Sequence, residues 1–353
     1  MCRAAKYLLL AAILALIGFV PDLPAQQDAC GTRNIFVRVE DENRQPVTGL
    51  TERSFTAFMG KQVIAITSVE PAPVVKRIAL LLDNSASMAD KFNQHVLIGT
   101  AASLVERSPA GAQFFWINFS VSPVVGEPFT SDHERLANEI RQFPNKNPWK
   151  GPTSLFDAIQ VSLTKVFHPG DEDSAVIVIS DGDDNTSQIT VADTERLVAY
   201  SGIRLFLVQL VSPGDTVSEM MQKSSGGVLE GIIQSAGGEL FQLGRDYPPK
   251  PPHRRPFTFR VEKDYGNLPD IADAILSELS AGYVLKLSLP HAIGKVEALK
   301  LELSGDSSQK PPDYLVSYPK KLFPCAASTS NNKSHWTRVI TGPFAIKVNV
   351  CDV

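Results

Sequence analysis

The chain has 353 residues, of which 43% are hydrophobic and 20% are charged, so it can build a real core and is not a disordered protein. Its 34 Lys and Arg against 38 Asp and Glu give a formal net charge of −4, which disfavours a nucleic-acid-binding protein. Four cysteines are too few for a disulfide-built scaffold.

The N-terminal segment has the pattern of an export signal. Arg3 and Lys6 precede an apolar run over residues 8–20, and prolines and Ala25 follow it. A run of 13 apolar residues is shorter than the roughly 20 that cross a bilayer as a helix. We therefore predict a signal peptide over residues 1–25, no transmembrane span after its cleavage, and a secreted, periplasmic or cell-envelope location.

Residues 31–72 alternate apolar and polar side chains in short runs, broken at 41–43 and 59–60. This alternation predicts β-strands and hairpins. The segment has too few strands for independent stability, so it needs a partner elsewhere in the chain.

Residues 76–281 have a different character, because their apolar runs are continuous and helical patterns separate them. Such runs are typical of parallel strands that are covered by helices on both faces. The runs lie at 78–82, 114–119, 175–179 and 203–211, and the helices are expected near 90–106, 132–143, 153–167 and 190–200. We predict a doubly wound, Rossmann-like α/β domain with a mostly parallel sheet of six strands.

The pattern changes again after residues 247–256, which hold five prolines and read as an exposed loop. One helical face over 268–279 can close the α/β domain. Residues 282–318 return to β patterning, and we expect them to pack with 31–72 as a small flanking β domain built from both chain ends. Residues 319–353 are left as a tail.

All four cysteines lie near the chain ends, and residues 31–324 contain none. An oxidising compartment permits a disulfide among Cys30, Cys325 and Cys351. We predict that Cys325 pairs with Cys351 and ties down the tail.

Oxygen-bearing side chains cluster where the apolar strands end. Asp83, Ser85 and Ser87 follow one strand, and Asp181 follows another. Thr153 lies just before a predicted helix. The carboxyl ends of parallel strands meet at one edge of the sheet, so these five side chains are expected in a common crevice.

This set of oxygens without His or Cys suits a hard cation such as Mg²⁺, with Mn²⁺ or Ca²⁺ as alternatives. Neutral hydroxyls leave most of the charge of the ion uncancelled. If the aspartates act through bound water, an Asp or Glu of a partner protein can complete the octahedron. The sequence leaves open the identity of that partner and the oligomeric state.

The pattern Asp83-x-Ser85-x-Ser87, followed by Gly151-x-Thr153 and Ser180-Asp181-Gly182, resembles the metal-ion-dependent adhesion site of von Willebrand factor type A (VWFA) domains. The resemblance covers residues 76–281. It implies that the serines and the threonine coordinate Mg²⁺, that the aspartates act mostly through water, and that a ligand supplies the last oxygen.

The flanking residues are similar to a bacterial VWFA-related subfamily that is typical of exported proteins of Acidobacteria. The similarity lies in the stretch 47–66 and in Glu278-Leu279 followed by Tyr283-Val284-Leu285. It implies an adhesion-type protein.

Two other functions compete with metal-dependent, non-catalytic protein binding. One is a structural envelope protein in which the metal only stabilises the fold. The other is a Mg²⁺-dependent hydrolase, which is disfavoured because the sequence has no HExxH, GxSxG or P-loop motif. Asp183, Asp184 and Asn185 are read as a second cation site or a solvated turn, and Asp157 as an outer-shell group or a surface carboxylate.

Overall fold

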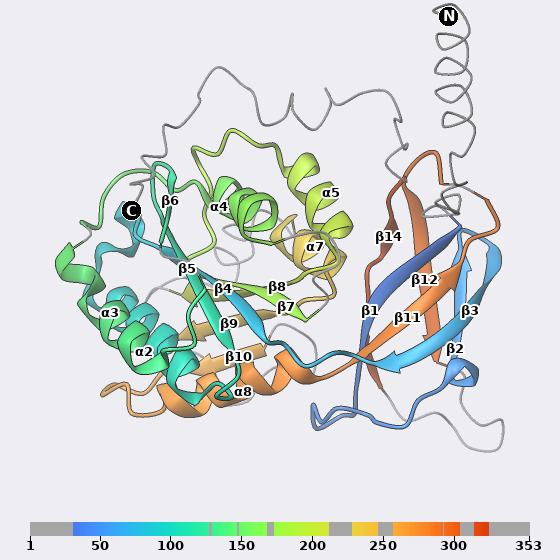
Figure 1. The fold of residues 1–353 in the computed structure, drawn as a ribbon, viewed down its shortest axis with the longest axis horizontal. Coiled ribbons are helices and arrows are strands. Elements are labelled where there is room, and N and C mark those ends of the chain that lie inside the picture. The colour runs from blue at the N-terminus through green and yellow to red at the C-terminus, as the bar shows by residue number, and fades with distance from the viewer. Residues whose placement is uncertain are drawn as a thin grey trace, which may run out of the picture.

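The computed structural model describes residues 31–126, 129–146, 148–167, 173–211, 228–245, 257–291, 293–303 and 314–324. Within them the strands form two separate sheets (Figure 1). The predicted signal peptide and the three cysteines of the mature chain lie outside the described residues. No helix in the described residues is long and apolar enough to cross a membrane.

The first sheet belongs to an α/β domain and has the strand order β10-β9-β8-β7-β4-β5-β6. All neighbouring pairs are parallel except β5 and β6. The strands are β4 (Arg77–Asp83), β5 (Gln113–Phe119), β6 (Pro123–Val125), β7 (Ser174–Ser180), β8 (Arg204–Val211), β9 (Leu240–Gly244) and β10 (Phe257–Arg260).

The described sheet therefore has seven strands, and the predicted count of six is wrong. The difference lies at the edges of the sheet. β6 has three residues and begins with Pro123, and β10 has four residues and directly follows the proline-rich stretch. Strands this short leave no hydrophobic period to detect, and proline is tolerated at a sheet edge.

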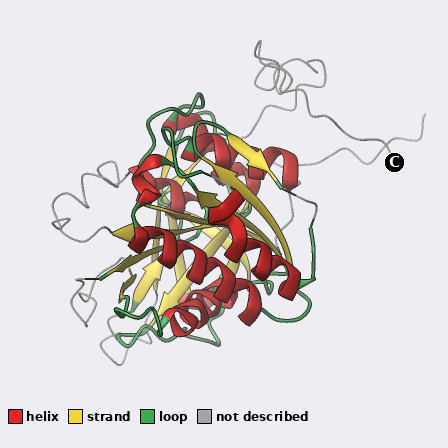
Figure 2. Ribbon diagram, turned by 90° about the vertical axis from the view of Figure 1, so that its left-hand side faces the viewer, coloured by secondary structure: helices red, strands yellow, loops and turns green. Residues whose placement is uncertain are grey.

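Helices cover both faces of this sheet. One face carries α2 (Lys91–Arg107), α3 (His133–Lys146) and α8 (Leu268–Ser280), and the other carries α4 (Leu155–Val161), α5 (Val191–Ser201) and α7 (Val228–Ser235) (Figures 1 and 2). Along β4, Leu80 and Leu82 join the core under α2 while Leu81 joins the core under α4. Burial on both faces explains why these strands are apolar at every position.

The second sheet is antiparallel and has the order β13-β1-β11-β3-β2-β12-β14. Both ends of the chain contribute to it. Its strands are β1 (Thr32–Glu40), β2 (Phe55–Met59), β3 (Gln62–Pro71), β11 (Tyr283–Ser288), β12 (Glu297–Leu303), β13 (Leu315–Ser317) and β14 (Lys321–Leu322). The sheet continues past the expected end at Tyr318, because β14 pairs with β12 inside the segment that was expected to be a tail.

A buried charge cluster joins the two sheets. Arg38 of β1 is 1% exposed and places its Nε 2.6 Å from Glu40 and its Nη1 3.0 Å from Glu278 of α8. Its Nη2 contacts Glu239, which lies just before β9. Because charges this deeply buried are stable only when they are paired, the cluster fixes β1 against the α/β domain.

Candidate metal centre

The five side chains predicted to bind a metal lie in three loops at the carboxyl edge of the parallel sheet. β4 ends at Asp83 and β7 ends just before Asp181, and the two strands are hydrogen-bonded neighbours. Thr153 lies in the loop before α4. The amide of Ala86 donates to the carbonyl of Gly151 at 3.0 Å, which holds the loop after β4 against the loop of Thr153.

Main-chain contacts also join the loop of Thr153 to the loop after Asp181. The Asn185 amide donates to the Thr153 carbonyl at 3.0 Å, and the Thr153 amide donates to the Asn185 Oδ1 at 2.8 Å. The structure therefore brings all three predicted loops together. Each of the five predicted residues lies on one of these joined loops.

Ser85 and Ser87 present their hydroxyls side by side, with the two Oγ atoms 3.0 Å apart. Adjacent oxygens around an octahedral Mg²⁺ at 2.0–2.1 Å are about 3.0 Å apart, whereas Ca²⁺ at 2.3–2.6 Å would place them about 3.3–3.7 Å apart. In this structure the two hydroxyls are hydrogen-bonded to each other, and they lie close enough together for both to bind one small cation.

Asp83 is fully buried, and both of its carboxylate oxygens accept hydrogen bonds. The Ser85 amide donates to Oδ1 at 2.9 Å, and the Ser180 hydroxyl donates to Oδ2 at 2.5 Å. Burial, and then repulsion by Asp181, raises the pKa of Asp83 to about 7. Among the described residues no ion pair neutralises these two buried carboxylates, and such an electrostatic setting favours the binding of a cation.

Four of the five side chains are buried, and Ser87 reaches the surface. Asp83, Ser85, Thr153 and Asp181 are all buried, and the exposed fraction of Asp181 is 6%. Ser87 is exposed. A cation held by these residues would therefore be approached from the side of Ser87.

The acidic loop after β7 supports α4, and its oxygens already have donors in the protein. Asp184 Oδ2 accepts the Phe156 amide at 2.9 Å, so it caps α4, whose N-cap Ser154 makes no side-chain capping bond. Asp157 accepts the amides of Gln188 and Ile189. Asp157 thus anchors this loop, and its role as an outer-shell group or a surface carboxylate stays a prediction.

Sequence reasoning missed the residues that hold the aspartates in place. Ser180 binds Asp83 and also accepts the Gly182 amide at 3.0 Å. Gln209 Nε2 donates to the Asp181 carbonyl at 3.0 Å, and Gln242 Nε2 donates to Gln209 Oε1 at 2.9 Å. The available signal was a buried glutamine in the middle of each apolar strand, where an amide needs a hydrogen-bonding partner.

The described part of the chain holds no group of three or more His, Cys, Asp or Glu side chains that could bind a metal. The candidate centre differs from such groups because it combines two carboxylates with three hydroxyls. Oxygen donors of this kind suit Mg²⁺ or Mn²⁺ better than a thiolate- or imidazole-binding metal.

A comparison with protein families matches residues 78–183 to the von Willebrand factor type A domain. This stretch of the chain is similar to a VWFA domain. The matched stretch includes all five candidate ligands, from Asp83 to Asp181. The α/β fold of the described residues continues beyond the match, through β8, β9, β10 and α8.

Solved structures that match the chain come from varied organisms. An aerotolerance-related membrane protein from Bacteroides fragilis is 16% identical over 57% of this chain and 98% of its own, with a TM-score of 0.40. Proximal thread matrix protein 1 of the mussel byssus was solved with zinc in its MIDAS motif. It is 15% identical over 65% of this chain and 49% of its own, with a TM-score of 0.42.

A von Willebrand factor type A protein from Catenulispora acidiphila is 10% identical over 84% of this chain and 74% of its own, with a TM-score of 0.40. No curated protein matches the chain.

Proposed function

We propose that this is an exported, non-catalytic protein that holds a divalent cation at its VWFA site and binds a partner protein through that cation. Asp83, Ser85, Ser87, Thr153 and Asp181 would hold the ion, and a carboxylate of the partner would complete its coordination. The observation that carries the proposal is the convergence of three hydrogen-bonded loops that bring two serine hydroxyls beside a buried pair of aspartates.

The hydrogen bonds of Asp83 support an open coordination position. Both of its oxygens already accept protein donors, which favours an indirect role through water over direct ligation. The direct ligands would then be mainly neutral hydroxyls, and the ion would keep a strong attraction for an incoming carboxylate. Ser87 at the surface gives that carboxylate a way in.

Mg²⁺ is the proposed ion, because hydroxyl, carboxylate and water oxygens are the ligands that it prefers. Mn²⁺ prefers similar oxygen ligands and is the alternative. The ion would supply positive charge beside the two buried carboxylates, and the five protein residues would orient it.

A non-catalytic role is proposed from the chemistry of the side chains. His95 stacks on Tyr265, and His133 contacts the Ala112 carbonyl at 2.8 Å, so each has a packing role away from the candidate ligands. Export is proposed from residues 1–25 alone, together with the envelope or extracellular location that it implies.

The test combines metal binding with partner capture. Mg²⁺ titration by calorimetry on the chelated full chain should give saturable binding that Thr153→Ala and Asp181→Ala abolish. Envelope proteins of the source organism should be retained by the immobilised chain with Mg²⁺, released by EDTA, and not retained by either variant. Thr67→Ala, at an exposed position of β3 in the antiparallel sheet, is the matched control and should behave like the original chain.

Two outcomes would contradict the proposal. Capture that persists in EDTA would exclude a metal-bridged contact. A rise in melting temperature with Mg²⁺, without any metal-dependent capture, would assign the ion a structural role instead.

A further inference from the structure

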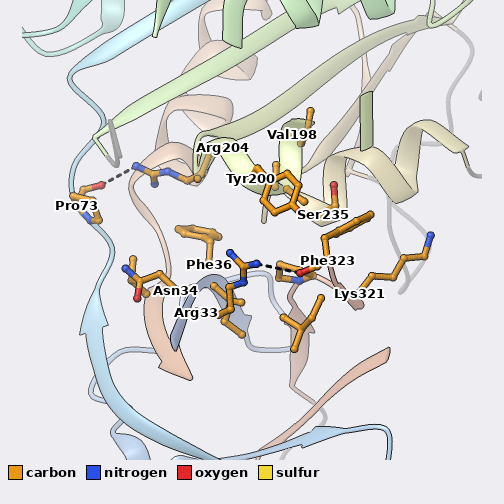
Figure 3. Close-up of a pocket in the computed structure, with 17 residues that line it drawn as sticks. Arg33, Asn34, Phe36, Pro73, Val198, Tyr200, Arg204, Ser235, Lys321 and Phe323 are labelled. Carbon is orange, nitrogen blue, oxygen red and sulfur yellow. Dashed lines mark hydrogen bonds between the residues drawn. The ribbon is translucent and has the colours of Figure 1, made fainter. Parts of the chain in front are cut away.

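A cavity of about 100 Å³ lies between the two sheets, far from the metal centre (Figure 3). β1 supplies Arg33 and Phe36, α5 supplies Tyr200, β8 begins with Arg204, and Phe323 follows β14. Arg204 opens its strand at the amino edge of the parallel sheet, whereas the metal centre occupies the carboxyl edge. The cavity therefore belongs to a different part of the molecule.

The lining of this cavity is positively charged. Among the described residues that line it are Arg33, Arg204 and Lys321, and none of them is Asp or Glu. Lys321 is paired with Glu195 at 2.8 Å just outside the lining. The two guanidinium groups thus set the charge that a molecule inside the cavity would meet.

Arg204 is 2% exposed, and none of the described carboxylates lies within ion-pair distance of it. Its guanidinium donates to the main-chain carbonyls of Leu279 and Pro73, the second at 2.8 Å (Figure 3). Burial lowers the pKa of Arg204 to about 10, although Asp173 acts in the opposite direction. The group stays charged at neutral pH, and its charge is only partly balanced by carbonyl dipoles.

Aromatic rings orient both guanidinium groups. Arg33 lies over the Tyr200 ring at 5.6 Å and donates to the Phe323 carbonyl at 3.1 Å. Arg204 lies over the Phe36 ring at 5.1 Å, and Tyr200 meets Phe323 edge to face. A guanidinium stacked in this way directs its donors along its own plane, which suits a planar carboxylate.

The size of the cavity limits the ligand. At about 30 Å³ per molecule it has room for about three waters, and it is smaller than the roughly 150 Å³ cavity that admits benzene. A nucleotide or a sugar is therefore too large. The aromatic rings in the lining favour an apolar stem over the fully polar surface of phosphate. The Ser235 hydroxyl already donates to the Ile232 carbonyl at 2.6 Å, so its hydrogen is not available to a phosphate oxygen.

We propose that this cavity is a second binding site, which takes a carboxylate on a short aliphatic stem. The carboxylate would bind at the guanidinium groups, and the stem would pack against Phe36, Tyr200 and Phe323. A free short-chain acid and the side chain of a glutamate in a partner share this chemistry. The proposal does not depend on the metal centre.

The test uses the full chain with EDTA present, so that the metal centre cannot contribute. Propionate, titrated by calorimetry and by ligand-observed NMR, should bind saturably with a Kd of about 1 mM or lower. Propionamide, which has the same shape without the charge, should not bind. A capped Gly-Glu-Gly peptide presents the same stem from a chain, and tighter binding of the peptide than of propionate would identify a partner's side chain as the source.

Two variants locate the binding. Arg33→Met keeps the stem and removes the charge, and it should weaken propionate at least tenfold, since a charge-assisted hydrogen bond contributes about that factor. Ala199→Leu fills the cavity without changing its charge and should also abolish binding. Lys61→Met, in the exposed turn between β2 and β3, loses the same charge far from the cavity and is the control.

The melting temperature of each variant verifies that it is folded. The proposal is overturned if propionate and propionamide behave alike, if phosphate binds more tightly than propionate, or if folded Arg33→Met and Ala199→Leu still bind propionate normally. Since Mg²⁺ is absent from every arm, a negative result here leaves the proposed metal-dependent function untouched.

Discussion

At the proposed metal site, Asp83 should link cation binding to pH, because a cation beside its carboxyl group favours the ionised form over the protonated one. Burial and the neighbouring Asp181 raise its pKa to about 7, so the proton is held at pH values where an exposed aspartate has lost it. A divalent cation favours the ionised form. We therefore expect Mg²⁺ affinity to be highest above pH 7 and to fall about tenfold for each pH unit below it.

Calorimetric titration with Mg²⁺ at about pH 8, 7 and 6 measures this dependence. Repeating one titration in two buffers of different ionisation enthalpy should show a proton released as the cation binds. Near-ultraviolet circular dichroism at each pH verifies that the fold is unchanged. Equal affinities at the highest and lowest pH would show that protonation of the Asp83 carboxyl is not linked to cation binding.

The sequence predicted the candidate ligands better than it predicted the residues that hold them in place. Asp83 and Asp181 could be placed because each directly follows a continuous apolar run, and such runs end at one edge of a parallel sheet. Ser180 and Asn185 could not, because their partners depend on how two loops from distant parts of the chain meet. Local pattern carries no information on that meeting.

β1 and α8 meet in a cluster whose charge depends on pH. Arg38 and Arg44 face Glu40, Glu239 and Glu278, so the carboxylates outnumber the guanidinium groups. Burial raises the pKa of Glu278 from 4.5 to about 7, despite the attraction of Arg38. The folded protein thus keeps a proton that the unfolded chain releases near pH 4.5.

The sign of the effect on stability follows from this difference in bound protons. Between about pH 4.5 and 7 the folded state binds more protons than the unfolded state, so the free energy of unfolding falls as the pH rises. The contribution is on the order of 2–3 kcal/mol across the window. Glu278→Gln is permanently neutral and should flatten that part of the pH profile.

Urea unfolding of both chains from about pH 5 to pH 8 tests the prediction. Asp83 titrates in the same range, so the quantity of interest is the difference between the two profiles, measured at saturating Mg²⁺. Parallel profiles would mean that Glu278 does not hold the proton.

Strand pairing shows where local pattern stops being informative. The alternation in residues 31–72 predicts strands, and β1, β2 and β3 are there. β1 does not form a hairpin with β2, however, because it pairs with β11 and β13 from the other end of the chain. Alternation fixes which side chains face the core and leaves the choice of neighbouring strand to contacts distant in sequence.

The two sheets meet at the amino edge of the parallel sheet, and the metal centre lies at the opposite edge. At the amino edge, a short connection leads from β3 into β4. Two residues of the α/β domain contact β1 there: Glu239, just before β9, and Gly282, just after α8. Figure 1 shows the antiparallel sheet at one end of the molecule, with α2 and α3 toward the other. Within the described residues, the antiparallel sheet therefore does not cover the edge that carries the candidate metal ligands.

Phe36 is the main apolar contact of this joint, and glycine makes its position possible. Gly237 has φ +65°, and a Cβ there would lie 2.5 Å from the Phe36 Cβ. Gly237→Ala should therefore destabilise the protein through both backbone strain and overpacking. Gly49→Ala is the matched control, because Gly49 has φ +78° and open space around it.

The control should cost about 1 kcal/mol, which is the strain of alanine at positive φ, and Gly237→Ala about 1–3 kcal/mol more. Chemical denaturation measures both values. Mg²⁺ affinity should stay the same in both folded variants, because the joint and the metal centre lie at opposite edges of one rigid sheet. Equal losses of stability would show that Phe36 moves aside freely, and a change in Mg²⁺ affinity confined to Gly237→Ala would show that the two edges are coupled.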